Sequence, residues 1–265
     1  MLTAKQFSYY CLKKCTVVKR ALEICQASGW LHGKSFIYGH LGNSYFELGD
    51  YQQARVYHGE ALTICREVND REGEAVSLDT LGLIAHDSGD LQTATAHFEA
   101  ALAIQQSIGD QRGQAYTETH LGYTLSRLEQ FEEAEGFLQH ARQLRQKLGE
   151  ISPIVDSLAG LATNALASGE GNEAQWYVDQ VLAHLEKQGI NGVELPVQVY
   201  WICYQVLWAS VSHRARARAV LQAGYELLQE RAAAIQDEAL RQQFLQAVPY
   251  NRALQQAWQG REFSA

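Results

Sequence analysis

Proline is scarce in this sequence, and so are the patterns that indicate β-strands. Only three prolines occur in 265 residues, so little interrupts a helix. Alternating apolar and polar residues bounded by turn residues are hard to find, whereas alanine, leucine and glutamine abound. Hydrophobic residues make up 46% of the chain, which is enough for one substantial core or for a stack of small cores. We therefore predict an all-α protein.

Long apolar runs and an excess of basic charge are lacking as well. No stretch of about 18 apolar residues predicts a transmembrane helix, and the opening residues MLTAKQFSYYCLKKC do not have the form of a secretory signal. The net charge of −8 repels nucleic acid and anionic membranes, so we expect neither as a partner. The cysteines follow no disulfide framework, which favours a reducing cytoplasm. They are Cys11, Cys15, Cys25, Cys65 and Cys203.

A 40-residue period runs through the middle of the chain. A Leu-Gly pair stands at 41–42, 81–82 and 121–122, and two alanines follow each pair at constant distances. A fixed period of this size is the signature of a repeat array.

One unit, residues 73–112, predicts two antiparallel helices. The first should stop at Gly89, because glycine adopts the left-handed conformation that ends helices, and Asp90 should cap the second. Gly109 should stop the second helix, and Asp110 can cap the next one. Apolar residues at helical spacing are Val76, Leu81, Ile84 and Ala85 in the first helix, and Leu91, Ala94, Phe98, Ala101, Leu102 and Ile104 in the second.

A glycine lies inside each first helix, where it costs roughly 1 kcal/mol relative to alanine. We predict that close backbone contact between the paired helices offsets this cost at Gly82, with Ala94 and Ala101 supplying a matching small surface. One helix pair cannot bury its apolar face alone, so the pairs should stack into a superhelix with a concave inner face.

These residues resemble the tetratricopeptide repeat. The family's usual period is about 34, and the step of 40 is similar to a longer-helix variant of bacterial regulatory proteins; HEAT and armadillo arrays share a period near 40 but lack the glycine and alanine pattern. The resemblance implies a right-handed α-solenoid of about five helix-turn-helix repeats with a C-terminal capping helix. The matching positions are Leu41, Gly42, Tyr45, Ala54, His58 and Ala61, then Leu81, Gly82, Ala85, Ala94, Phe98 and Ala101, then Leu121, Gly122, Leu125, Ala134, Leu138 and Ala141.

The domain organisation follows from the same step. Residues 1–32 form a partial first repeat, whose missing helix is replaced by residues 1–8 or belongs to a longer protein. The closing segment, 233–265, falls outside the period and should cap the last apolar face. The solenoid between them spans 33–232, in units of about 33–72, 73–112, 113–152, 153–192 and 193–232, the last with an insertion.

The concave surface is the candidate site that the resemblance implies. Asn43 matches the asparagine of the family's peptide-carboxylate clamp, but Gly39 stands at the lysine position, so the clamp is absent and chaperone C-terminal tails are not expected as ligands. What remains is an aromatic and mixed-polar groove, and aromatic residues and arginine anchor interfaces. Glu47 belongs to the same face. The predicted partner-binding residues are Asn43, Phe46, Asp79, Leu83, His86, Tyr116, Thr119, Tyr123 and Arg127.

Four other motifs have a structural and a functional interpretation, and the structural one is favoured in each. Gly33-Lys34-Ser35 has the end of a phosphate-binding loop without its first glycine or a preceding strand. Cys11 and Cys15 lack the further ligands of a zinc site. His40 and His120 share a repeat position and could titrate together. The basic cluster 213–218 could bind a phosphate or an acidic partner, or form a solvated face.

The predicted function is a non-catalytic interaction module that binds a peptide, a helix or a domain of its own parent protein, in bacterial signalling or transcriptional regulation. The alternative is a small-molecule-sensing tail of a larger ATPase or transcription activator. An enzyme and a structural oligomer remain as further hypotheses, although the sequence nominates no catalytic residue and no cofactor.

Overall fold

The computed structural model describes residues 15–262, and these form helices in two compact units. Unit 1 contains the described residues up to 113 together with 232–248, and unit 2 contains 114–231 together with 249–262. The part of the chain that is described has no strand, which confirms the all-α prediction. Within it, no helix is both long and apolar enough to cross a membrane.

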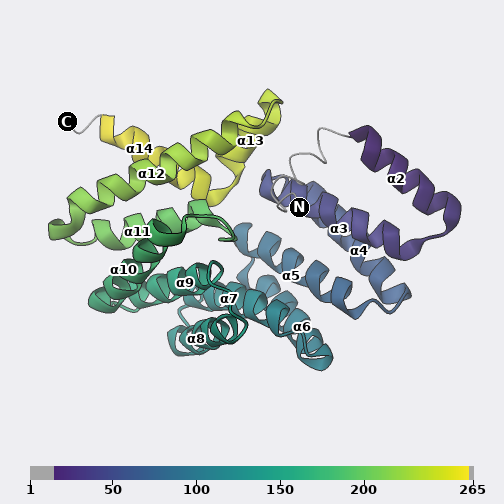
Figure 1. Ribbon diagram of the computed structural model, residues 1–265, viewed down its shortest axis with the longest axis horizontal. Coiled ribbons are helices and arrows are strands. Elements are labelled where there is room, and N and C mark those ends of the chain that lie inside the picture. Colours follow the sequence, from purple (N-terminus) through teal and green to yellow (C-terminus); the bar gives the residue numbers. More distant parts are fainter. Residues whose placement is uncertain (1–14, 263–265) are drawn as a thin grey trace. The chain divides into compact units, whose positions relative to one another are not determined.

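Unit 1 is built from antiparallel helix pairs (Figure 1). The first helices α3 and α5 pack against the second helices α4 and α6, and α3 also contacts α5. The helices start at 31, 51, 71 and 91, so the pairs follow the step seen in the sequence. The bounds are α2 Cys15–Ser28, α3 Leu31–Glu47, α4 Tyr51–Glu67, α5 Arg71–Asp87, α6 Leu91–Ile108 and α13 Glu238–Ala247.

Unit 2 contains two further pairs and a less regular end. Its first helices are α7, α9 and α11, and α9 packs against α8, α10 and α11. The bounds are α7 Gln111–Arg127, α8 Phe131–Lys147, α9 Ile154–Ala167, α10 Gly171–Gln188, α11 Pro196–Trp208, the 3₁₀ turn η1 Val211–His213, α12 Arg214–Ala233 and α14 Pro249–Glu262.

The turns between helices repeat one device at half the period of the helix pairs. A residue with positive φ follows each helix from α2 to α10, and in unit 1 the next residue is usually an aspartate whose carboxylate accepts the N–H three residues later, as Asp90 does from Thr93 and Asp110 does from Gly113. The expected stops at Gly89 and Gly109 are confirmed. The residues with positive φ in this series are Gly29, Gly49, Asn69, Gly89, Gly109, Glu129, Gly149, Gly169 and Gly189.

The glycine inside each first helix has a different partner from the one we expected. A Cβ built at Gly82 would lie 2.6 Å from Cε1 of Phe98, so glycine leaves room for a side chain of the second helix. His58 faces Gly42, and Leu138 faces Gly122, in the same way. The flanking alanines are fully buried, but the residue between them makes the contact. The nearest atoms to these glycines thus belong to a side chain of the second helix, where we had expected backbone contact beside the alanines.

The C-terminal segment divides between the two units. In unit 1, Ala247 at the end of α13 lies against the turn at Gly49, where an added Cβ would be 2.9 Å from the alanine Cβ. In unit 2, α14 packs against α11. Its Trp258 stacks on Tyr225 of α12 with ring centroids 4.7 Å apart. The helix α14 thus covers the last helices of unit 2.

Candidate interaction surface

One position of the first helix is exposed in unit 1. Phe36 on α3 is 65% exposed and Val76, one period later on α5, is 47% exposed. Val76, which has the helical spacing of the apolar residues of its helix, is thus exposed, and Phe36 was not among the predicted site residues. A signal was present, because both residues are apolar and share one repeat position outside the Leu-Gly motif.

The two exposed residues lie on one face of neighbouring helices. The Thr80 hydroxyl of α5 donates to Asn43 Oδ1 of α3 at 3.4 Å. Val76 precedes Thr80 by one helical turn, and His40 precedes Asn43 by nearly one turn. Phe36 contacts the His40 ring edge-on, with centroids 4.3 Å apart. Phe36 and Val76 therefore define an apolar strip on these two helices, which we call the unit 1 face.

Four of the predicted groove residues of unit 1 are half-buried beside this strip, namely Asn43, Phe46, Asp79 and Leu83. The Asn43 amide oxygen also accepts from Nε2 of the buried His58 at 3.0 Å. Burial lowers the pKa of His58 to about 4, and the charge of His40 adds to this shift. His86, also predicted for the groove, is buried.

The predicted groove residues of unit 2 are mostly enclosed. Thr119 is buried, and its hydroxyl donates to the Ala115 carbonyl at 2.8 Å. Tyr123 is buried, and its hydroxyl donates to the Asp156 carbonyl at 3.0 Å. Tyr116 is half-buried and Arg127 is exposed. Thr119 and Tyr123 thus pack within this unit rather than lining an open groove.

A segment of the chain itself covers this part of unit 2. The amide N–H groups of Glu194 and Leu195 donate to the Asp156 carboxylate at 3.1 and 3.4 Å. The Glu194 carboxylate lies 3.3 Å from Nε2 of the buried His120. These residues belong to the connection between α10 and α11, which is the insertion expected in the fifth repeat.

A fully buried arginine lies beneath the covered face. Arg145 on α8 donates to the carbonyls of Pro153 at 2.5 Å and Ala115 at 3.3 Å, and it lies 3.9 Å from the Asp156 carboxylate. Its guanidinium carbon is 4.5 Å from the centre of the Tyr116 ring. The preceding second helices carry Cys65 and Gln105 at this repeat position.

The arginine accompanies a late helix start. The period predicts that α9 begins at 151, but it begins at Ile154 after Pro153. The Pro153 carbonyl accepts from Arg145, so the arginine stabilises the irregular turn. Burial raises the pKa of Asp156 to about 6, and the neighbouring Glu194 adds to this, although Arg145 opposes it.

The two histidines that share a repeat position have different surroundings. His40 is half-buried in unit 1, and burial lowers its pKa. His120 is buried in unit 2 beside Glu194. They lie in separate units, so a common titrating ladder stays a prediction.

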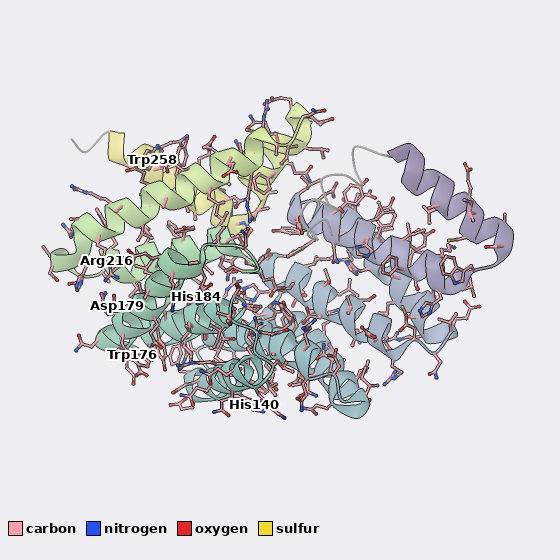
Figure 2. The ribbon with its side chains drawn as sticks, in the orientation of Figure 1. His140, Trp176, Asp179, His184, Arg216 and Trp258 are labelled. Atoms are coloured by element: carbon pink, nitrogen blue, oxygen red, sulfur yellow. The ribbon has the colours of Figure 1, made fainter. Side chains whose placement is uncertain are left out.

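The basic cluster lies on an exposed surface of α12. Arg216 forms an ion pair with Asp179 of α10 (Figure 2). The Arg214 guanidinium carbon lies 5.2 Å from the centre of the Trp208 ring. These contacts fit the interpretation as a solvated face.

The two motifs near the N-terminus are only partly described. Gly33, Lys34 and Ser35 lie within helix α3, and an added Cβ at Gly33 would overlap the Trp30 ring. The glycine therefore packs under tryptophan. Cys11, the side chain of Cys15 and the suggested cap 1–8 lie outside the described residues. Among those that are described, no group of three or more His, Cys, Asp or Glu is arranged to hold a metal ion.

Comparison with known proteins agrees with this architecture. Family models described as tetratricopeptide repeat match residues 35–107 and 119–153. No curated protein sequence matches the chain.

Several solved structures share the fold at low identity. BtubC from P. vanneervenii has a TM-score of 0.62 and 17% identity, covering 89% of this chain and 93% of its own. Aspartyl phosphate phosphatase F from Bacillus subtilis has a TM-score of 0.62 and 14% identity, covering 85% of this chain and 60% of its own. A Rap protein complexed with competence and sporulation factor has a TM-score of 0.59 and 13% identity, covering 97% of this chain and 76% of its own. With these helix pairs and family matches, residues 35–107 and 119–153 of the chain are identified as tetratricopeptide repeats.

Proposed function

We propose that the protein is a non-catalytic interaction module and that the unit 1 face binds a peptide or helix of a partner protein. The observation that carries this is the exposure of Phe36 and Val76 on neighbouring first helices. Burying a large apolar side chain stabilises a complex by about 1.5–3 kcal/mol. A partner that covers both side chains therefore gains binding free energy from them, to which further contacts along the face must add because association itself is costly.

The polar neighbours of the strip supply orientation. Asn43, Asp79 and the ring of His40 offer hydrogen-bonding groups at the edge of the apolar surface, and Phe46 and Leu83 extend it. This combination of apolar anchors and a few polar groups is typical of peptide-binding grooves. From the predicted set, the unit 1 face retains Asn43, Phe46, Asp79 and Leu83 and adds Phe36 and Val76.

A signalling or regulatory setting in a bacterial cytoplasm is the context that we propose. Two similar structures support it, because one is an aspartyl phosphate phosphatase of Bacillus subtilis and the other is a Rap protein complexed with competence and sporulation factor.

The test replaces the apolar anchors and compares them with a matched residue. Phe36→Ser combined with Val76→Ser should weaken partner capture by at least about tenfold, since each buried anchor is worth about 1.5 kcal/mol or more. The control is Val56→Ser, because Val56 on the second helix α4 is 53% exposed but lies outside the first helices. Affinity capture identifies the partner, and calorimetry with that purified partner gives the dissociation constants.

Circular dichroism must show unchanged helicity in both variants. Equal binding by the double variant and the wild type would refute the assignment of the unit 1 face, and so would an equal loss in Val56→Ser. The sensor alternative predicts instead that a metabolite raises the melting temperature in a thermal-shift screen without any captured protein.

A further inference from the structure

The connection between α10 and α11 is long compared with the other turns. It spans residues 189–195, whereas the connections between the helices α3 to α6 contain three residues each. The short turns join antiparallel helices without surplus chain. The longer connection therefore contains residues that the helical turn itself does not require.

These surplus residues lie against unit 2 as a turn, closed by the Val193 N–H donating to the Ile190 carbonyl at 3.3 Å, followed by two bend residues. The Val193 side chain is 1% exposed and belongs to the hydrophobic core cluster of this unit. The next two amides donate to the Asp156 carboxylate, and the Glu194 side chain reaches His120. Gly192 has φ of +87°, and an added Cβ would lie 3.0 Å from Cβ of Ser152, so the backbone approaches closely. One apolar anchor, backbone hydrogen bonds and one acidic contact are the elements of peptide recognition.

The covered surface corresponds in register to the exposed surface of unit 1. Asp156 occupies the repeat position of Phe36 and Val76, yet it is 4% exposed. His120 occupies the position of His40 and Thr80. At this position the helical face is therefore open in the first two repeats, carries the half-buried Tyr116 in the third and is covered by the chain's own segment in the fourth.

We propose that residues 190–195 are an internal, exchangeable occupant of a second peptide-binding site in unit 2. The site takes a segment that forms a turn and then carries a small apolar residue followed by an acidic residue. Asp156 binds its backbone amides and His120 binds its carboxylate. The site is distinct from the unit 1 face and does not depend on the function proposed there.

Exchange requires the internal segment to leave, and tethering opposes this. A segment fixed at both ends has an effective concentration in the millimolar range or above, so a free peptide of the same sequence competes poorly. Loops held by few buried contacts open locally at a lower free energy than the helices around them. The site is thus closed in the isolated protein and opens to a partner that binds more tightly or more extensively.

The experiment removes the contacts of the internal segment by substitution, which vacates the site, and then supplies the original segment as a separate peptide. The variant carries Ile190→Gly, Asn191→Ser, Val193→Ser and Glu194→Gly, which keeps the length of the connection. The control is Asn191→Ser alone, because Asn191 is exposed. The probe is a fluorescein-labelled peptide with the sequence of residues 189–197, GINGVELPV, and anisotropy measures its binding.

We expect the vacated variant to bind this peptide at least ten times more tightly than the control does. A second probe peptide has serine in place of Val193 and glutamine in place of Glu194. The vacated variant should bind this second peptide no more tightly than the control does. Equal binding of the two peptides by a folded vacated variant would overturn the proposal.

If the variant does not fold, a second measurement on the unmodified protein tests whether the internal segment opens separately from the helices around it. In native-state hydrogen exchange, the amides of Glu194 and Leu195 should exchange at least ten times faster than the central amides of α9. If they exchange only together with α9, the segment is a fixed part of the core and the proposal is wrong.

Discussion

The two units use the same repeat with different chemistry at equivalent positions. In unit 1, Cys65 fills the junction between one helix pair and the next, and the face of α3 and α5 is open. In unit 2, Arg145 fills the equivalent junction, and a segment of the chain covers the face above it. The comparison teaches that the repeat fixes the positions of the helices, while the length of the connection between two helices decides whether a face is covered.

The largest effect should come from the buried arginine of unit 2. Arg145→Met should lower the free energy of unfolding by about 3–5 kcal/mol, because it leaves the Asp156 carboxylate without its buried partner and two carbonyls without their donor. Cys65→Ala at the equivalent position of unit 1 should cost only about 1 kcal/mol, the loss of one small side chain. Urea unfolding measures both.

A control on the same helix separates burial from charge. Arg142→Met removes a half-buried arginine that donates to Gln180 at 3.4 Å, and it should cost less than about 1 kcal/mol. Equal midpoints of urea unfolding for the variants Arg142→Met and Arg145→Met would show that Arg145 does not stabilise the junction between the helix pairs.

The next largest effect should come from the glycines that face a second helix. Gly82→Ala should destabilise unit 1 by about 1–3 kcal/mol, because the new methyl group would overlap the Phe98 ring. Gly59→Ala in α4 should instead stabilise by about 0.5–1 kcal/mol, since nothing lies within 4 Å of its added Cβ and alanine favours the helix. Thermal unfolding should show opposite shifts, and shifts of the same sign would contradict the close packing at Gly82.

The smallest effect is a difference in pH dependence between the units. His58 in unit 1 has a pKa lowered from 6.5 to about 4, so the unfolded chain binds its proton more readily and stability is lost as pH falls from about 6.5 to 4. Asp156 in unit 2 has a pKa raised from 3.8 to about 6, so the folded chain binds its proton more readily and stability is lost as pH rises from about 4 to 6. The two contributions therefore have opposite slopes, and each has an upper limit of about 3 kcal/mol, the equivalent of a shift of slightly more than two pKa units.

Two substitutions isolate these slopes. His58→Leu places the residue found at 138 against Gly42, and Asp156→Asn keeps an acceptor for one amide. Each should remove the pH dependence of its own unit, measured by urea unfolding from pH 4 to 7 with hydrogen exchange of α4 and α9 as local probes. An unchanged slope in either variant would assign that titration to another group.

The helices could be predicted from the sequence because their signals are local. The capping aspartates, the glycine stops and the 40-residue step fix helix starts at 71 and 91, as the structure shows. The late start of α9 at Ile154 was not predicted, because the regular step gives no information about an arginine that hydrogen-bonds to a proline carbonyl.

The candidate site was predicted less well because exposure depends on distant segments. The register predicts Asn43 and Leu83 for the concave face, and both are half-buried, but it cannot show that residues near 194 would cover Asp156 and enclose Tyr123. Helical spacing identifies Val76 as part of an apolar side, but it does not show whether a neighbour packs on this side chain, which is 47% exposed.

The even spacing of the left-handed turn residues has a consequence for how such a chain grows. A duplication or deletion of one whole period, with its ends at Gly49 and Gly89, joins two equivalent turns, so every helix beyond the join keeps its caps and its apolar side in phase. Unequal recombination within the gene can therefore lengthen or shorten the array in one step. Natural variation in this protein should accordingly alter the number of whole pairs more readily than the length of any one helix.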